Sequence, residues 1–399
     1  MYMKTTNKTG FMPNHKRLCR PTRLPEIPGD LISEILVRLP VRSLLRFKSV
    51  CRTWHATISG RSFISTHLQR SFSDHQRHPS FLISPDLQAK KEPNKIRLYR
   101  WQKGQDSARL VYTLDLQRDS APVEVYMLGH CNGLVLVPTD TKMHVLNPST
   151  RELLTLPEST RGMLSPSSIF RSIVGLGLDP STNNYKVVRF FSYPSDLSRI
   201  GMEICTINET GRAWRSNVAD PPYPISDYQT ATFFQGSLFW TLDELILMPP
   251  PECRLLRFCL KDEVFSFVMH PPCPGLDDGD EFTLNVLDGE LCLAQFDSSQ
   301  RMVMWMTNDA VNPQWDRRYV LHIEPSLTIA ISHHGLLLVD RHRVFQYDFQ
   351  SQKTEDVARL DGLKYDGPGS STIKYVRRCT CFVDVVPCIE SLIAIDSAV

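Results

Sequence analysis

Apolar residues between positions 24 and 70 recur at the spacing of a helix, and prolines divide them into short runs. Asp30 is a good N-cap residue, and the helical pattern that follows it ends before Pro40, because a proline forces the preceding residue out of the helical conformation. The apolar positions of that helix are 31, 32, 35, 36 and 39. Ser43 and Ser62 begin two further runs of the same spacing. The pattern predicts a compact bundle of short helices.

This bundle has more apolar positions than it can bury. A unit of about forty residues has a marginal core, so part of its apolar surface has to be covered by something else. Two arrangements meet this requirement: the bundle packs against the rest of the chain, or it fills a groove in a partner protein. The spacing alone leaves both open.

After residue 80 the pattern changes from helical spacing to short strands. Polar residues 71–79 separate the two regions and are expected to form a connector. Apolar runs such as "GLVLV" (133–137) and "SLFWTL" (237–242) alternate with turn clusters such as "NPST" and "DPSTNN". No amphipathic helix pattern lies between these runs, which argues against a parallel α/β sheet, whose crossovers need helices.

The strand-like runs repeat along the chain. Glycines at positions 133, 177, 236, 289 and 335 open or interrupt an apolar strand, with separations of 44, 59, 53 and 46 residues. Gly177 is the poorest match, because its strand follows a turn. A period of about 50 residues with four short strands is typical of a β-propeller and predicts about six blades over residues 80–395.

Ring closure is expected at the C-terminal end of this region. An open array of blades leaves unpaired strand edges at both ends. The stretch "TCFVDVVPCIESLIAI" (380–395) is strand-like and is predicted to close the ring against the first blade. The expected fold is therefore a small all-α bundle followed by an all-β propeller.

The composition agrees with an ordinary globular protein. The chain has 399 residues, of which 42% are hydrophobic and 22% charged, with a formal net charge of +2. So small a net charge argues against a general nucleic-acid binder, and no apolar run approaches the roughly 18 residues of a membrane helix. Eleven cysteines are expected to be buried free thiols in a reducing compartment.

Residues 1–23 form a basic segment without an acidic residue. Its polar composition, with proline and threonine, predicts a disordered tail. No apolar run follows the basic residues, so the segment is not expected to be a secretory signal. We therefore expect the protein in the cytoplasm, the nucleus or both.

Catalytic and metal-binding patterns are weak in this sequence. No Gly-x-Ser-x-Gly elbow occurs, and "GLGLDP" lacks the helix that follows a dinucleotide-binding loop. Two groups have the residue types of metal ligands: Cys379, Cys381, Cys388 and His333, His334, His342. Neither group has a second pair at the spacing of a zinc finger. The sequence therefore predicts no catalytic residue, no metal and no cofactor.

One pattern in the helical region combines Leu24-Pro25, Pro28, Leu31, Ile35-Leu36, Leu39-Pro40, Leu44, Val50-Cys51 and Trp54. Through these residues, the stretch 24–70 resembles the F-box. The resemblance implies that the helices bind a Skp-type adaptor, which joins the protein to a cullin and a RING subunit in a ubiquitin ligase of the SCF type. It therefore favours the arrangement in which a partner groove covers the bundle.

The same resemblance assigns contacts with the adaptor. They are Pro25, Ile27, Pro28, Leu31, Ile35, Leu36, Leu39, Pro40, Leu44 and Leu45. Val50, Cys51 and Trp54 either contact the adaptor or hold the helices together, and the sequence does not separate these two roles. Each large apolar side chain buried in such an interface contributes about 1.5–3 kcal/mol.

Residues 80–395 resemble the F-box-associated domain of the large plant F-box family. The matching stretches are "CNGLVLV" (131–137), "LNPSTRELLTLP" (146–157), "GLGLDPSTNNYKVV" (175–188), "QGSLFWTL" (235–242) and "FVDVVPCIESL" (382–392). They imply a kelch-like propeller that presents a protein target. The whole chain then resembles a non-catalytic substrate receptor that directs its target to ubiquitination and degradation. An adaptor-bound scaffold or decoy outside the ligase, or a propeller enzyme, are the alternatives.

The target surface is expected on loops away from the connector, because loops vary without disturbing the core. Two loops, 189–201 and 218–230, combine aromatic, proline and charged residues. Tyr193, Tyr223 and Tyr228 are candidates for target binding, since aromatic side chains anchor interfaces. The alternative is that both segments are ordinary surface loops.

Overall fold

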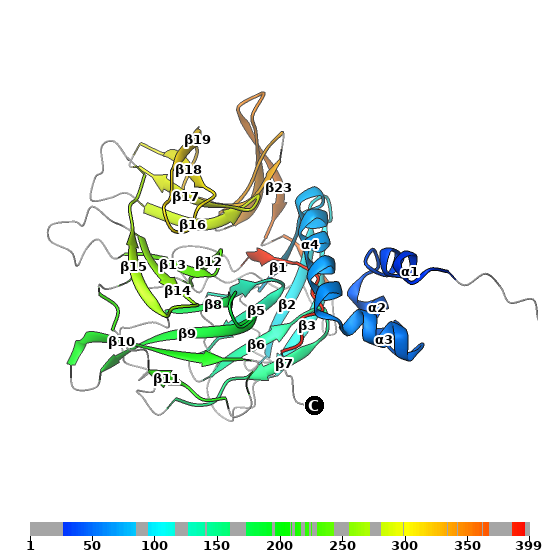
Figure 1. Cartoon of the computed structure of the whole chain (residues 1–399). Helices are drawn as coiled ribbons and strands as arrows, with labels where there is room; N and C mark the ends of the chain where they lie inside the picture. Colours follow the sequence, from blue (N-terminus) through cyan, green and yellow to red (C-terminus); the bar gives the residue numbers. More distant parts are fainter. Residues whose placement is uncertain are drawn as a thin grey trace, which may run out of the picture.

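The computed structural model contains, within its described residues, a group of four α-helices and a six-bladed β-propeller (Figure 1). The described residues are 27–84, 95–115, 127–139, 142–159, 173–193, 196–207, 209, 212–216, 220–222, 225, 230–242, 255–271, 281–297, 299–332, 334–340, 342–360, 362–366 and 385–395. The predicted disordered tail, residues 1–23, lies outside them.

The helices divide the N-terminal region more finely than the sequence pattern suggests. They are α1 (Gly29–Leu36), α2 (Val41–Phe47), α3 (Arg52–Ser59) and α4 (Arg61–Arg77). The run expected to continue from Ser43 towards Trp54 is interrupted after α2. Cys51 then caps α3, because its Sγ accepts a hydrogen bond from the Trp54 backbone N–H at 3.4 Å.

Helix α4 extends through most of the segment expected to be a connector, so residues 71–77 are helical. No proline or glycine interrupts the chain between Arg61 and His78, and a helix tolerates polar residues wherever they face solvent. The helix ends before Pro79, which disfavours the helical conformation at His78. The polar residues in this stretch therefore belong to the exposed surface of α4 and do not end the helix.

Six sheets form the blades, which we number by the order of their inner strands around the ring. Blade I contains β25 (Val385–Pro387), β1 (Ser80–Ile83), β2 (Lys95–Gln102), β3 (Ser107–Asp115) and an added edge strand, β24 (Lys364–Asp366). Blade II contains β4 (Gly129–Cys131), β5 (Leu134–Pro138), β6 (Met143–Asn147) and β7 (Glu152–Thr155). Blade III contains β8 (Val174–Asp179), β9 (Asn184–Tyr193), β10 (Asp196–Thr206) and β11 (Arg215–Ser216).

The remaining three blades have the same inner-to-outer order. Blade IV contains β12 (Thr232–Phe234), β13 (Ser237–Thr241), β14 (Leu255–Cys259) and β15 (Val264–Val268). Blade V contains β16 (Glu281–Leu287), β17 (Glu290–Phe296), β18 (Arg301–Thr307) and β19 (Asp316–His322). Blade VI contains β20 (Leu327–Ser332), β21 (Gly335–Val339), β22 (Arg343–Asp348) and β23 (Lys353–Arg359).

Strands from both ends of the propeller region complete blade I. Strand β25 is antiparallel to β1, with Val386 opposite Leu82, and β24 is parallel to the outer strand β3. The predicted closure of the ring by the segment 380–395 is therefore confirmed. Residues 388–395 leave the sheet after β25 and are not a strand.

One five-residue turn recurs in four blades. In each case the backbone N–H of the fifth residue donates to the carbonyl of the first: Arg151 to Asn147, Asn183 to Asp179, Glu263 to Cys259 and Gln352 to Asp348, at 2.8 to 2.9 Å. The fifth residue has a positive φ of 55° to 66°. In blade III this turn joins the first two strands, where blade II has Gly133. Gly177 lies inside β8, so its place in the predicted glycine repeat is wrong.

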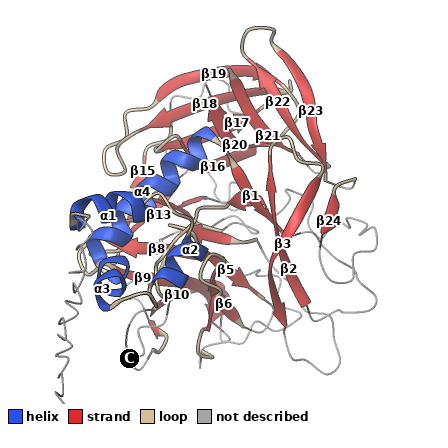
Figure 2. Ribbon diagram, turned by 90° about the vertical axis from the view of Figure 1, so that its right-hand side faces the viewer, coloured by secondary structure: helices blue, strands red, loops and turns tan. Residues whose placement is uncertain are grey.

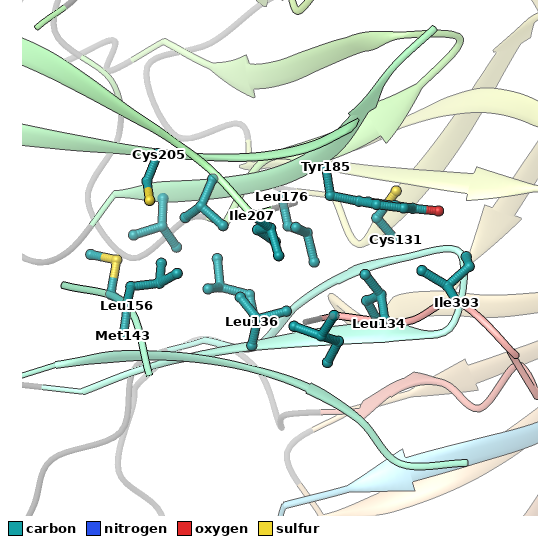
Figure 3. Packing of buried hydrophobic residues seen from close by; sticks show 14 residues of the cluster. Cys131, Leu134, Leu136, Met143, Leu156, Leu176, Tyr185, Cys205, Ile207 and Ile393 are labelled. Atoms are coloured by element: carbon teal, nitrogen blue, oxygen red, sulfur yellow. The ribbon is translucent and has the colours of Figure 1, made fainter. Parts of the chain in front are cut away.

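The propeller core lies between neighbouring blades. Between blades II and III, Leu134, Leu136, Leu176 and Tyr185 pack together with Ile393 of the C-terminal segment (Figure 3). Along β5 these side chains alternate with Val135 and Val137, which face the other way and are buried against blade I. The C-terminal segment therefore contributes to the core of the propeller.

Several cysteines behave as small apolar residues. Cys131, Cys205 and Cys292 are buried free thiols, as expected, whereas Cys51 is exposed. Burial raises the pKa of Cys205 to about 11 and that of Cys292 to about 12. A thiol with so high a pKa is not a nucleophile at neutral pH.

Candidate protein-interaction surfaces

The four helices share a small core of their own. Leu36, Val41, Leu44, Ile58 and Phe63 are buried in it. Leu36 and Leu44 are 1% and 0% exposed, which corrects their assignment as surface contacts. Successive residues of a helix are about 100° apart, so Leu36 faces the bundle while its neighbour Ile35 faces solvent.

The other predicted contacts divide into exposed and half-buried residues. Ile27, Leu31, Ile35 and Val50 are 58%, 54%, 53% and 59% exposed. Pro28, Pro40 and Cys51 are also exposed, and Leu39, Leu45 and Trp54 are half-buried; Pro25 lies outside the described residues. Leu31 and Ile35 are one turn apart on α1 and present their side chains on one face. We call Ile27, Leu31, Ile35 and Val50 the exposed apolar set.

Basic residues accompany the exposed apolar set. The exposed arginines between residues 27 and 61 are Arg38, Arg42, Arg46, Arg52 and Arg61. The acidic residues of the same region are Asp30 and Glu34, and Glu34 is paired with Arg38 at 3.0 Å. The sequence contains an excess of basic over acidic residues between positions 27 and 61. The spacing of apolar residues does not reveal this excess.

Helix α4 carries the bundle across one face of the propeller (Figure 2). Gln76 Nε2 donates to Asp288 Oδ1, in the turn between β16 and β17, at 2.7 Å. Ile64 and Leu68 pack against the core between blades II and III. Of the two arrangements that the sequence left open, packing on the rest of the chain is therefore observed on one side of the bundle, and another side of the bundle stays exposed.

The strand ends that flank the long connections share one face of the propeller. Strand direction alternates within a blade, so the first connections of the blades share one face, which is the face that α4 reaches through Asp288. The strand ends that flank seven connections of 11 to 18 residues lie at the other face: 84–94, 116–128, 156–173, 217–231, 242–254, 269–280 and 367–384. This face, which we call the long-connection face, therefore lies away from the helices.

The structure corrects one of the two predicted target loops. Residues 189–201 belong mostly to the hairpin of β9 and β10, because the aromatic and β-branched residues before Pro194 continue the strand. Tyr193 ends β9; its hydroxyl donates to Asp220 Oδ1 at 3.1 Å, and its ring meets that of Phe191 edge-on at 5.2 Å. Tyr223 and Tyr228 lie outside the described residues.

Comparison with known families matches both units of the chain. The F-box domain matches residues 24–66, and the F-box associated beta propeller domain matches residues 82–366. The chain belongs to the F-box-associated β-propeller family. Both resemblances noted in the sequence are thereby confirmed. The pair of domains is that of an F-box substrate receptor, a class that is generally non-catalytic.

F-box proteins of Arabidopsis thaliana are similar to this chain over most of its length. F-box protein At3g08750 is 28% identical over 300 residues, which are 71% of this chain and 70% of that protein. F-box protein At1g11270 is 24% identical over 306 residues, which are 74% of this chain and 92% of that protein. Among solved structures, apo AztD from Citrobacter koseri aligns with a TM-score of 0.40 and 9% identity, over 77% of this chain and 96% of that one.

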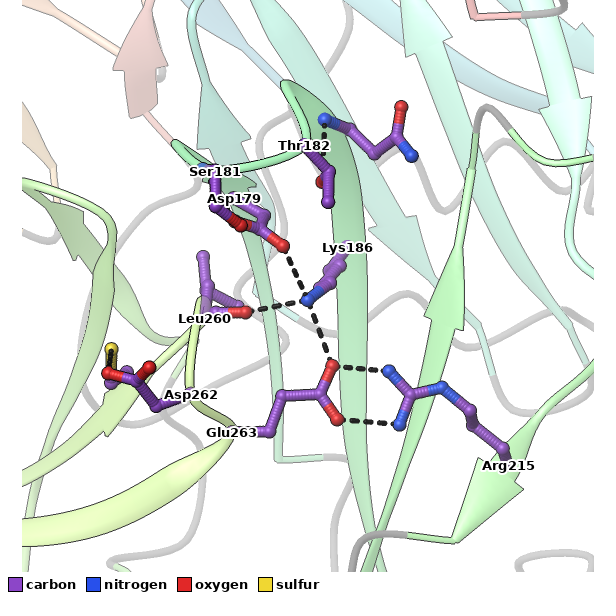
Figure 4. Close-up of polar contacts among 10 residues, drawn as sticks. Asp179, Ser181, Thr182, Lys186, Arg215, Leu260, Asp262 and Glu263 are labelled. Atoms are coloured by element: carbon purple, nitrogen blue, oxygen red, sulfur yellow. Dashed lines mark hydrogen bonds and ion pairs between the residues drawn. The ribbon is translucent and has the colours of Figure 1, made fainter.

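The F-box-associated domain contains a buried ionic network between blades III and IV (Figure 4). Lys186 Nζ lies 2.7 Å from Asp179 Oδ2 and 2.9 Å from Glu263 Oε1, and donates to the carbonyl of Leu260 at 2.6 Å. Arg215 also pairs with Glu263. Each charge in this network is met by an opposite charge, so the network joins the two blades.

The same network sets the ionisation of its carboxylates. Burial opposes the charged form of Asp179, but hydrogen bonds from Lys186 and Ser181 outweigh it and lower the pKa of Asp179 below its ordinary range. The pKa of Glu263 is lowered in the same way, against burial, by Arg215 and Lys186. Both groups are therefore charged at neutral pH, as a structural ion pair requires.

Metal-binding and membrane-spanning features were also sought in the described part of the chain. No group of three or more His, Cys, Asp or Glu side chains there is close enough to hold a metal ion. Of the candidates from the sequence, Cys379, Cys381 and His333 lie outside the described residues. In the same part of the chain, none of the helices combines the length and apolar character needed to cross a membrane.

Proposed function

We propose that this protein is the substrate-recognition subunit of an SCF-type ubiquitin ligase. Its F-box binds a Skp-type adaptor, which joins it to a cullin and a RING subunit, and its propeller binds a protein target. No chemistry takes place in this chain: tethering raises the effective concentration of target lysines near the ubiquitin-conjugating enzyme. The target is then ubiquitinated and degraded. This role places the protein in the cytoplasm, the nucleus or both.

The observation that carries this proposal is the separation of two surfaces. The exposed apolar set lies on the helical bundle, which reaches one face of the propeller, and the strand ends that flank the long connections lie at the opposite face. An adaptor bound at the helices therefore leaves the long-connection face accessible to a target. A protein that bridges two partners needs this arrangement, and an enzyme with a single site does not.

Adaptor binding is tested on α1. Replacing Leu31 and Ile35 together with alanine removes two exposed side chains and leaves the core of the bundle filled. Capture of a Skp-type adaptor should weaken by more than about tenfold, or 1.4 kcal/mol, because central apolar anchors dominate interfaces. The thermal unfolding midpoint should not change. Wild-type capture by this double variant would contradict the assignment of the adaptor surface.

Two controls make this test specific. Leu153→Ala and Val320→Ala remove exposed apolar side chains from outer strands of the propeller, and both variants should capture the adaptor like the wild-type protein. Leu36→Ala is unsuitable, because it opens a cavity in the bundle and would weaken binding through instability.

Purification with its partners separates a ligase subunit from a scaffold or decoy. A tagged full-length chain should retain both the adaptor and a cullin, and the Leu31→Ala, Ile35→Ala variant should lose both together. Recovery of the adaptor without the cullin would favour a role outside the ligase.

The target surface is tested once a target has been identified by proximity labelling. Tyr193→Ala, Tyr223→Ala and Tyr228→Ala should leave adaptor capture unchanged, and at least one should weaken target capture by more than about tenfold. Tyr193→Phe removes the hydroxyl that donates to Asp220 and keeps the ring, so it shows whether the ring or the hydroxyl matters. Wild-type target capture by all three alanine variants would exclude these tyrosines as anchors.

A further inference from the structure

Residues 388–395 lie between the F-box helices and the propeller. They follow β25, which closes the ring, and continue beside α4 (Figure 1). Most of the segment is buried, with Ser391 fully inaccessible to solvent and Leu392 4% exposed. We call residues 388–395 the C-terminal strap.

Blade II holds one side of the strap. Asn147 Nδ2 donates to the carbonyl oxygens of Ser391 at 3.0 Å and Ile393 at 2.9 Å, and the Ile395 N–H donates to Glu152 Oε2 at 3.0 Å. The side chains of Ile393 and Ile395 pack in the core between blades II and III. These contacts fix the path of the strap on the propeller.

The strap also passes close to Gly133, in the first turn of blade II. Gly133 has a φ of +82°, and a Cβ atom built on it would lie 2.5 Å from the Ile389 carbonyl oxygen. Only glycine combines this conformation with so close an approach of another backbone. The turn is therefore shaped to admit the strap.

The other side of the strap belongs to the F-box. Leu392 packs in the core of the helical bundle, together with Leu36, Leu44 and Ile58. Glu390 Oε2 accepts a hydrogen bond from the Val41 backbone N–H at 2.9 Å. Val41 is the first residue of α2, and this helix has no side-chain cap at its own N-cap residue, Pro40. The strap therefore supplies both a core side chain and a helix cap to the F-box.

Helix α4 is the second attachment of the F-box to the propeller. His67 of α4 makes a hydrogen bond to the Leu39 carbonyl through Nε2 at 3.0 Å, and Phe63 of α4 packs in the bundle core. Through these contacts α4 holds α1 to α3 from one side of the bundle. Contacts from a second, separately anchored segment restrict the movement of α1 to α3 on the propeller further.

We propose that Glu390 and Leu392 are positioning residues, which fix the orientation of helices α1 to α3 on the propeller. Their contacts make the distance between the exposed apolar set and the long-connection face a property of the folded chain. The proposal goes beyond the ligase role, since it concerns this chain alone. In a ligase, such a fixed distance would determine which target lysines are reached.

The test compares variants of the full-length chain without any partner. Labels at exposed residues Thr53 of α3 and Val320 of β19 report the distance between the two units, and hydrogen exchange reports the protection of each helix and strand. Glu390→Ala combined with Leu392→Ala removes the cap and the core contact. Because eleven cysteines are present, the labels are introduced on unnatural amino acids.

The expected result is a wider distance distribution with selective loss of protection in the helices. Amides of α1 to α3 should exchange at least about tenfold faster, because a core leucine and a cap are lost, while strands β5 and β6 stay as protected as in the wild type. Glu390→Gln keeps an acceptor for Val41 and should retain the wild-type distance. Glu355→Ala and Leu153→Ala, at exposed sites on outer strands, are the matched controls.

Two outcomes would overturn the proposal. One is a wild-type distance distribution and wild-type exchange of α1 to α3 in the double variant. The other is an equal loss of protection in β5 and β6, which would make the strap part of the propeller core alone. Neither measurement uses the adaptor, so failure of the proposed ligase function leaves this test unaffected.

Discussion

At the residue scale, Asn147 and Asp179 occupy the first position of the same type of turn in neighbouring blades. Asn147 Oδ1 accepts the Ser149 N–H and Asp179 Oδ1 accepts the Ser181 N–H, at 2.9 and 2.8 Å. The other half of each side chain differs in chemistry. The amide of Asn147 donates to two carbonyl groups, whereas the carboxylate of Asp179 pairs with Lys186. The neutral amide of Asn147 thus donates to neutral carbonyl groups, and the negative carboxylate of Asp179 pairs with the positive Lys186.

Replacing the amide of Asn147 with a carboxylate should destabilise the protein. Asn147→Asp keeps the shape and the turn, but it removes two donors and places a carboxylate against two carbonyl oxygens. We expect the free energy of unfolding in urea to fall by at least about 2 kcal/mol, because buried acceptors are left unsatisfied. Asn312→Asp, at an exposed position, is the control. An Asn147→Asp protein as stable as the wild type would show that the strap does not depend on this amide.

His144 should make stability depend on pH below neutrality. Burial, with a smaller effect of Lys142, lowers its pKa from 6.5 to about 4. The folded state therefore keeps the ring neutral while the unfolded state takes up a proton. Its contribution is fully present above a pH of about 6.5 and is lost as the pH falls towards 4, by up to about 1.4 kcal/mol per pH unit.

Urea unfolding midpoints between these pH values measure this effect. His144→Gln can still make a hydrogen bond to Thr155 but does not titrate, so its stability should fall less steeply than that of the wild type. Identical pH dependence in the two proteins would mean that His144 is not the responsible group.

At the element scale, the exposed side of each helix and strand depends more on its neighbours in the fold than on its composition. Helix α4 continues through a polar stretch because its second half faces solvent, and the hairpin of β9 and β10 includes residues with the composition of a loop. On α1 the boundary falls between adjacent residues, since Ile35 is exposed and Leu36 is buried. The buried and exposed sides of a helix or strand thus depend on the direction in which its side chains point. A short apolar run in the sequence does not specify that direction.

The basic side of the helices predicts salt-dependent binding of the proposed adaptor. Arg42 of α2 and Arg52 of α3 are exposed on the bundle that also carries the exposed apolar set, so a partner that covers the bundle should carry acidic groups. Arg42→Ala with Arg52→Ala should weaken adaptor binding by about twofold to tenfold at low salt, and the difference should shrink as ionic strength rises. Titration calorimetry at several salt concentrations measures this. Equal salt dependence of wild type and variant would contradict the prediction, and Lys353→Ala on β23 is the control.

At the scale of the whole molecule, the two units are not independent, because they share core residues. Leu392 packs in the helical bundle, and Ile64 and Leu68 of α4 pack on the propeller core. Truncation should therefore lower stability in steps, although the propeller strands are all retained. A chain of residues 61–399 keeps α4 and loses the cover of Leu392, and a chain of residues 76–399 loses Ile64 and Leu68 as well.

Circular dichroism and thermal unfolding test this order. All three chains should show a β-rich spectrum, and the unfolding midpoint should fall from the full chain to 61–399 and again to 76–399, because each truncation exposes apolar surface. Equal midpoints would mean that the shared contacts contribute nothing to stability. A helix-dominated spectrum of the shortest chain would be incompatible with an autonomous propeller.

The sequence by itself determined the two units, the number of blades within one and the closure of the ring by the segment 380–395. These features depend on local patterns, namely apolar spacing, turn residues and a period of about 50. Spacing also identified Leu31 and Ile35 as residues of one helix face. Local patterns are sufficient here because they are repeated many times along the chain.

Only the tertiary structure decided which residues share a surface. The burial of Leu36 and Leu44, the contact of Leu392 with the F-box and the position of the long-connection face opposite the helices all depend on segments far apart in sequence. An apolar residue has the same periodicity whether it fills its own bundle, another unit or a partner. The neighbour that covers it is chosen by packing in three dimensions, and that choice has no signature in local spacing.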